Sequence, residues 1–172
     1  MAFTIDEEFL PAILTSQPMT DDQFAELCSE HPDLFFEMSA DGELIVMPPN
    51  YTLTAYRHRA ILTQLDRWAQ RDKRGGVAGA AGGFVLPNGA RRAPDAAWTL
   101  TSCVKALDKG MIERYWHLCP DFVIEVRSLT DRGRAIREKM REWIVNGAQL
   151  AWLIDPETRV VEIYRRAGTS RP

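Results

Sequence analysis

Three charged residues lie in strand-like and helix-like segments where a simple α/β sheet would not need them. Asp95 follows Pro94 at the start of a strand-like run, and Glu125 lies within the run Asp121–Arg127. Lys139 comes fourteen residues after Glu125, in a helix-like segment. Carboxylates from two adjacent strands can hold Mg²⁺ or Mn²⁺, and a lysine beside them can orient water, deprotonate it or offset negative charge. These residue types predict metal-dependent hydrolysis of a phosphodiester.

The spacing by itself is a weak signal, because Asp, Glu and Lys are common residues. In the simplest alternative, Glu125 pairs with Arg127 or with another arginine, and Asp95 caps a turn. The surrounding pattern favours a site instead. Phe122, Ile124 and Val126 alternate with Glu125, so the carboxylate replaces an apolar residue on the second face of a buried strand.

The elements that must position these residues follow from hydrophobic periodicity. A strand beginning after Pro94 places Asp95, Ala97 and Thr99 on one face, and Trp98 and Leu100 on the core-facing side. A helix follows residues 121–127, capped by Ser128 or Thr130 and ended by Gly147. Its predicted buried stripe, with Lys139 at the edge, consists of Ile136, Met140, Trp143 and Ile144.

The remaining pattern predicts a single α/β domain over residues 1–172. Residues 1–19 are expected to be irregular and residues 167–172 frayed. Glu37 alternates with Phe36 and Met38, which favours a surface position for it. Helices are predicted at 22–29, 52–73 and 105–111, and strands at 34–38, 43–47, 77–80, 84–86, 151–154 and 159–164. The apolar stripe of the long helix is predicted to consist of Leu53, Tyr56, Ala60, Ile61, Leu65 and Trp68.

Composition excludes several classes of protein. Three cysteines without a CxxC pair, and three scattered histidines, argue against a disulfide scaffold and a zinc site. No apolar run approaches about 18 residues, so no membrane-spanning helix is expected. The acidic first ten residues lack the basic start of a signal peptide, and the cytoplasm is the expected location.

Charge is distributed unevenly along the chain, although the net charge is only −3. Residues 1–45 hold eleven Asp or Glu and no Lys or Arg. Residues 57–92 hold eight basic and two acidic residues, and residues 127–141 hold six basic and two acidic residues. Such polarity can create a basic face for phosphates, and the alternative is that these side chains are simply solvated. The candidate nucleic-acid contacts are Arg57, Arg91, Arg92 and Arg132.

Four segments together resemble the Uma-two family of restriction-endonuclease-like proteins, within the PD-(D/E)XK nuclease superfamily. They are FEMSADGELIVMPP, YRHRAILTQL, GGFVLPNGARRAPDAAW and PDFVIEVRSLTDR with the REKMREWIVNGAQLAWLIDPETRVVEIY that follows. The resemblance covers about residues 20–166. Family members usually continue beyond the final hairpin, whereas this chain stops at Pro172.

The resemblance implies a restriction-endonuclease-like core, with a mixed central β-sheet flanked by helices, and metal-dependent cleavage of DNA. Asp95 and Glu125 match the family's acidic pair, and Arg127 stands where the superfamily usually has a lysine. Arginine stays protonated, so Arg127 is expected to stabilise charge while Lys139 acts on water. Glu37 matches a glutamate near the metal, and His58 matches a histidine of the long helix. A lone helical histidine can equally be structural.

Two other functions remain open from the sequence. The chain could be a nucleic-acid-binding or regulatory protein on the same fold, with weak or lost cleavage, because a fold does not fix a function. The acidic first 45 residues could instead bind a basic partner or another subunit. A homodimer is expected if both strands of a duplex are cut, since two sites related by a two-fold axis are the common arrangement.

Overall fold

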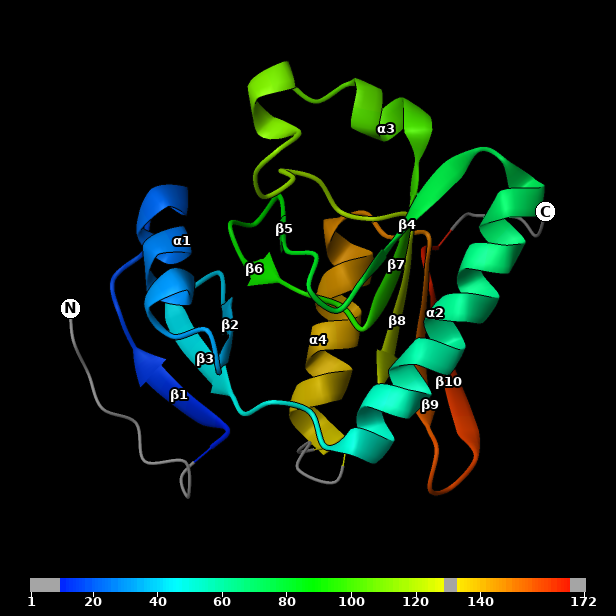
Figure 1. Cartoon of the computed structure of the whole chain (residues 1–172), viewed down its shortest axis with the longest axis horizontal. Coiled ribbons are helices and arrows are strands. Elements are labelled where there is room, and N and C mark those ends of the chain that lie inside the picture. Colours follow the sequence, from blue (N-terminus) through cyan, green and yellow to red (C-terminus); the bar gives the residue numbers. More distant parts are fainter. Residues whose placement is uncertain (1–9, 129–132, 168–172) are drawn as a thin grey trace.

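The described part of the chain forms two five-stranded sheets that meet near Asp95 (Figure 1). The structure is a computed structural model in which residues 10–128 and 133–167 are described. One sheet is mixed, and its strands in spatial order are β10 (Val160–Arg165), β9 (Leu150–Asp155), β8 (Phe122–Val126), β7 (Ala96–Leu100) and β4 (Gly75–Gly79). Strands β8 and β9 are parallel, and the other neighbours are antiparallel. The predicted α/β class with a mixed central sheet is confirmed.

The second sheet is antiparallel throughout and was not predicted. Its strands in spatial order are β1 (Ala12–Thr15), β3 (Glu43–Met47), β2 (Phe35–Met38), β6 (Arg91–Arg92) and β5 (Phe84–Val85). The chain leaves this sheet at Arg92 and enters the mixed sheet at Ala96, so Asp95 lies on the crossing. Strand β1 falls within residues 1–19, and the prediction that this segment is irregular is therefore wrong for Ala12–Thr15.

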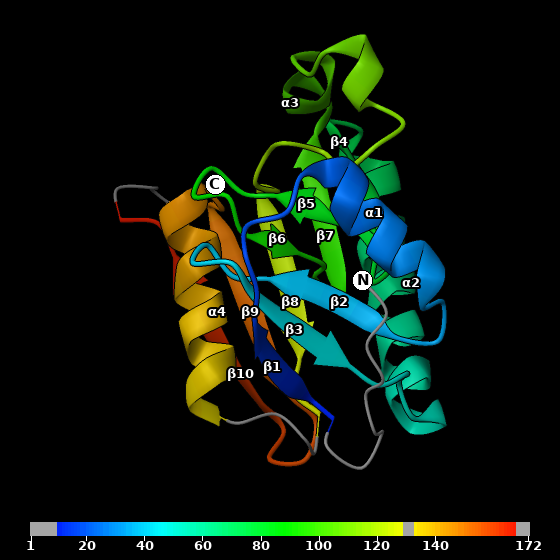
Figure 2. The same ribbon diagram turned by 90° about the vertical axis from the view of Figure 1, so that its left-hand side faces the viewer.

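Helices pack on both faces of the mixed sheet. The elements are α1 (Asp21–Glu30), α2 (Thr52–Asp72), α3 (Thr101–Lys105), the 3₁₀ turn η2 (Lys109–Met111) and α4 (Gly133–Asn146). From α2, Leu65 and Ala69 join a core with Trp98 and Ile124. From α4, Met140 and Trp143 pack on the opposite face of the sheet. Strands β2, β3 and β6 lie in front of the mixed sheet in Figure 2.

Local chemistry explains where several elements begin and end. Thr20 caps α1 through a reciprocal capping box with Gln23. Gly42 lies between β2 and β3 with φ +86°, a backbone conformation that favours glycine. Gly147 directly follows α4 with φ +130°, which ends the helix as predicted. Of the two residues predicted to cap the N-terminus of α4, Thr130 lies outside the described residues.

The predicted apolar stripe of α2 is only partly correct. Leu53, Tyr56 and Trp68 are exposed by 61%, 68% and 42% of their surface, whereas Leu65 and Ala69 are buried. Only one side of the second half of α2 packs on the sheet. The short helix placed at residues 105–111 begins earlier, as α3, and continues as the separate turn η2. Among the described residues, no helix is both long and apolar enough to span a membrane.

Candidate active site

Lys139 of α4 bridges two carboxylates that come from different sheets. Its Nζ lies 2.8 Å from Oε1 of Glu37, on β2, and 2.8 Å from Oε1 of Glu125, on β8. The side chains of Glu37 and Glu125 are 2% and 5% exposed, and that of Lys139 is 14% exposed. A buried ion triad therefore joins the antiparallel sheet, the mixed sheet and the helix between them. The favoured surface position of Glu37 is wrong, because α4 covers the face on which it lies.

Glu37 is held by more than Lys139. The backbone N–H of Ala93 donates to Oε1 of Glu37 at 2.9 Å, and Nη1 of Arg92 donates to Oε2 at 3.2 Å. Nε of Arg92 also donates to Oε2 of Glu142, on α4, at 2.6 Å. Both oxygens of Glu37 thus have partners, which makes this carboxylate an anchor for Lys139 and disfavours its predicted role as a metal ligand.

Glu125 and Asp95 occupy neighbouring positions on paired strands. The β7–β8 register pairs Ala96 with Ile124, so its continuation by one residue sets Asp95 opposite Glu125. Oδ2 of Asp95 accepts the backbone N–H of Val126 at 2.7 Å. The indole Nε1 of Trp143 donates to Oε1 of Glu125 at 3.0 Å. Glu125 thus lies on β8, and Asp95 directly precedes β7, the strand that pairs with β8, so β7 begins one residue later than predicted.

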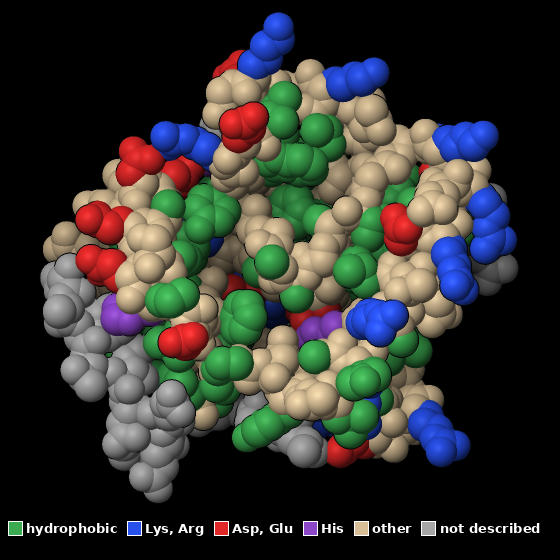
Figure 3. Space-filling view, in the orientation of Figure 1, with side chains coloured by type: hydrophobic (Ala, Val, Ile, Leu, Met, Phe, Trp, Pro, Cys, Tyr) green, Lys and Arg blue, Asp and Glu red, His purple; other side chains and the backbone are tan. Residues whose placement is uncertain are grey.

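His58 approaches the same place from α2. Its Nε2 lies 3.4 Å from Oδ1 of Asp95, and both side chains are largely buried. The long helix therefore contributes a polar group to the edge of the carboxylate pair. In Figure 3 the molecule is hollowed near the centre of this face, with acidic, basic and histidine side chains at the bottom of the hollow.

Burial and neighbouring charges set the protonation of the triad. Burial raises the pKa of Glu125 to about 8, the nearby carboxylates of Asp95 and Glu37 add to this shift, and Lys139 opposes it. Burial also acts to raise the pKa of Glu37, but Lys139 and Arg92 outweigh it and hold that pKa below its usual value. Burial would lower the pKa of Lys139, yet its two carboxylate partners raise it overall. The two carboxylates therefore favour the charged ammonium form of Lys139.

The chain was compared with protein families and with solved structures. A family model for Uma2, described as "Putative restriction endonuclease", matches residues 21–172. The chain belongs to the Uma2 family. A crystal structure titled as a putative nuclease belonging to DUF820 from Anabaena variabilis ATCC 29413 matches with a TM-score of 0.70 at 19% identity, covering 90% of this chain and 83% of that chain. At that identity the likeness shows a shared α/β fold. No curated protein matches the chain.

The carboxylates of this Uma2 chain fit an open magnesium site. Among the described residues, no group of three or more His, Cys, Asp or Glu side chains is arranged to hold a metal ion. Mg²⁺ does not require such a group, because it commonly binds through one or two carboxylates and keeps waters or substrate phosphates as its other ligands. The negative charge of Asp95 raises the pKa of Glu125, so the two carboxylates are near enough to repel each other. A divalent cation would relieve that repulsion.

Several predicted residues lie elsewhere in this Uma2 fold. Nη1 of Arg127 is 2.8 Å from Oδ2 of Asp155, at the end of β9, so its guanidinium is engaged away from the triad. Arg91 is 2.8 Å from Oδ1 of Asp21 and docks α1. Arg92 is buried in its pairs with Glu37 and Glu142. We therefore do not expect Arg91 or Arg92 to contact phosphates.

The other two predicted phosphate contacts are Arg57 and Arg132. Arg57 is half-buried and directly precedes His58 on α2, and it stays a candidate. Arg132 lies outside the described residues. The contributions of Trp143 and Glu142 to the site were missed from sequence. The helical spacing could have identified them, because Glu142 follows Lys139 by three residues and Trp143 follows Lys139 by four. Both therefore lie one helical turn from Lys139 on the same face.

Proposed function

We propose that this Uma2 protein is an endonuclease that hydrolyses phosphodiester bonds in DNA with Mg²⁺ or Mn²⁺ as cofactor. The observation that carries the proposal is the position of Asp95, just before β7, opposite Glu125 of β8, with the Lys139 ammonium 2.8 Å from Glu125. These are the three residue types that metal-dependent phosphodiester hydrolysis needs. Membership of a family described as "Putative restriction endonuclease" supports the same reaction class.

Asp95 and Glu125 are the residues that would hold the cation. When bound there, a hard divalent cation supplies Lewis-acid activation of water and neutralises charge on the phosphate. The N–H of Val126 fixes Oδ2 of Asp95, and the indole of Trp143 fixes Oε1 of Glu125, so both carboxylates are oriented before substrate arrives.

Lys139 supplies fixed positive charge beside the reacting phosphate. Its raised pKa favours charge stabilisation over proton acceptance among the three roles that the sequence left open. Its bonds to Glu37 and Glu125 hold the ammonium in one place, so stabilisation of the transition state needs little reorganisation. Arg92 keeps Glu37 charged and thereby acts through Lys139 as a positioning residue.

The test is cleavage of supercoiled plasmid DNA in Mg²⁺ or Mn²⁺. We expect cleavage by the wild-type protein and its loss in Asp95→Asn, with at least a ~10²-fold lower rate in Lys139→Met, the scale of one removed charge-stabilising group. Lys105→Met, an exposed lysine of α3, is the matched control and should cleave normally. Cleavage that persists in both site variants would show that the activity arises elsewhere.

A further inference from the structure

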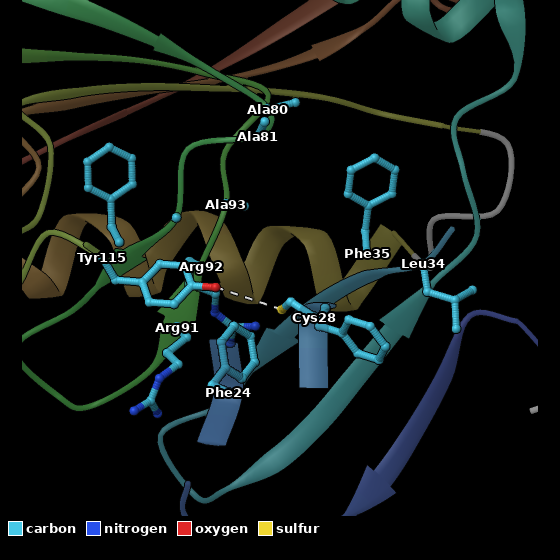
Figure 4. A pocket seen from close by; sticks show the side chains of 13 residues that line it. Phe24, Cys28, Leu34, Phe35, Ala80, Ala81, Arg91, Arg92, Ala93 and Tyr115 are labelled. Carbon is cyan, nitrogen blue, oxygen red and sulfur yellow. Dashed lines mark hydrogen bonds between the residues drawn. The ribbon is translucent and has the colours of Figure 1, made fainter. Parts of the chain in front are cut away.

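A cavity of about 200 Å³ opens between α1, β2, β6 and the loop that precedes β5 (Figure 4). Aromatic side chains dominate its lining. Phe35 and Tyr115 lie on opposite sides of it, with Ala80 and Ala81 of the loop above (Figure 4). Phe35 is 40% exposed, so part of its ring is accessible from solvent. The lining holds Arg91 and Arg92 but no carboxylate, so it does not repel a polyanion.

Two of the residues that line the cavity lie close in the chain to carboxylates of the site. Phe35 precedes Glu37 by two residues on β2, and strand alternation places both on one face, about 7 Å apart. Ala93, another lining residue, precedes Asp95 by two residues, again at most about 7 Å along the chain. A planar group in the cavity is therefore close enough to be covalently joined to a phosphate at Asp95 and Glu125.

We propose that this cavity receives one base of the substrate, from the nucleotide beside the cleaved phosphate, and that the preferred substrate is therefore single-stranded or locally unpaired. The inference rests on the proposed function. The volume suits a single ring system better than a larger ligand, since sites for drug-sized molecules are larger. Aromatic walls accept a base by stacking regardless of its identity.

A base in a stacked duplex cannot enter such a recess. It must first leave the stack, which costs least where the strand is already unpaired. Phe35, with its accessible ring, is the wall against which the base stacks, and Tyr115 closes the opposite side. Ala81 and Gly83 bring backbone close to the cavity, where N–H and C=O groups can meet the polar edges of the base.

The experiment measures binding and cleavage of a short single-stranded DNA oligonucleotide. Binding is followed in EDTA by fluorescence anisotropy, and a 2-aminopurine placed at each position in turn reports stacking. Replacing Phe35 by Ala should weaken binding about 5- to 100-fold, the scale of one base stacked on one aromatic ring. Phe35→Trp should retain binding. Ile163→Ala is a control of similar exposure on the distant edge strand β10 and should bind normally.

An oligonucleotide that lacks the base at the responding position separates stacking from a general loss of structure. It should bind wild-type protein as weakly as the Phe35→Ala variant binds the intact oligonucleotide, and the two changes together should cost no more than either alone. If the protein cleaves DNA but neither Phe35→Ala nor the missing base changes binding, the base site is wrong and the proposed function stands. If the base-dependent binding is found without any cleavage, the base site stands and the proposed function fails. If the protein does not bind the oligonucleotide, the base site is wrong, and the proposed function fails with it only if plasmid DNA is not cleaved either.

Discussion

Removal of the Lys139 ammonium should destabilise the fold strongly, and in a way that depends on pH. The variant Lys139→Met keeps the length of the side chain but leaves Glu37 and Glu125 without the cation that lies 2.8 Å from each. Both carboxylates are at most 5% exposed, so water cannot replace the lysine. Breaking a buried ion pair by removing one partner costs about 3–5 kcal/mol. At pH 6 Glu125 carries a proton, because its pKa is about 8, so the broken ion pair is the one with Glu37. Glu37 keeps Arg92 as a partner, which favours the lower end of that range.

The pH dependence follows from Glu125. Its folded pKa of about 8 lies above the ordinary value of 4.5, so the folded state binds the extra proton and stability falls as pH rises between these values. Without Lys139 the folded pKa rises further. Plotted against pH, the free energies of unfolding of wild type and variant should therefore run parallel below pH 8. Above pH 8 the difference between them should grow by up to about 1.4 kcal/mol per pH unit.

Urea unfolding at pH 6 and pH 9 measures both effects. With a slope of about 2 kcal/mol per molar urea, a loss of 3 kcal/mol lowers the midpoint by about 1.5 M at pH 6. The exposed Lys105→Met variant should stay within about 0.5 kcal/mol of wild type at both pH values. A Lys139→Met deficit below about 1 kcal/mol, or one that does not change between pH 6 and pH 9, would refute the assignment of a buried triad.

Four further predictions follow from the same structure. Mg²⁺ should raise the thermal unfolding midpoint of the wild-type protein but not that of Asp95→Asn in a melting scan, because only the former binds the ion. The backbone N–H of Thr158 and the Arg127 guanidinium hold the pKa of Asp155 at about 2, against 3.8 ordinarily. This stabilisation is complete above pH 3.8 and disappears towards pH 2, so Asp155→Asn should flatten the acid limb of a urea-midpoint curve. Burial raises the pKa of the Cys119 thiol to about 12, so this thiol should not react at pH 8 with a reagent specific for thiolates. Folded wild type and folded Cys119→Ser should therefore show the same number of fast-reacting thiols. After denaturation, wild type should show one more than the variant. Light scattering should give the mass of a homodimer, and a monomer that cuts both strands of a duplex would contradict the expected two-fold arrangement.

Sequence periodicity determined much of the candidate active site. Alternation in residues 121–127 placed Glu125 on one face and Ile124 on the other, and the two residues indeed belong to opposite sides of the mixed sheet. Helical spacing placed Lys139 at the edge of the stripe that holds Met140 and Trp143. These are local properties, because side-chain direction follows from backbone geometry within a single strand or helix.

Tertiary structure alone decided what covers each face. Alternation gave the direction of Glu37 correctly but could not show that α4 would pack there, and so the residue was placed at the surface. The same limit applies to Arg92, whose basic character suggested phosphate binding but whose partners Glu37 and Glu142 lie about fifty residues away in either direction. It applies to Arg127 as well, which pairs with Asp155 on a neighbouring strand. Sequence patterns specify which side a residue faces, whereas burial and charge pairing depend on contacts between distant segments, and these form only when the sheets and α4 assemble.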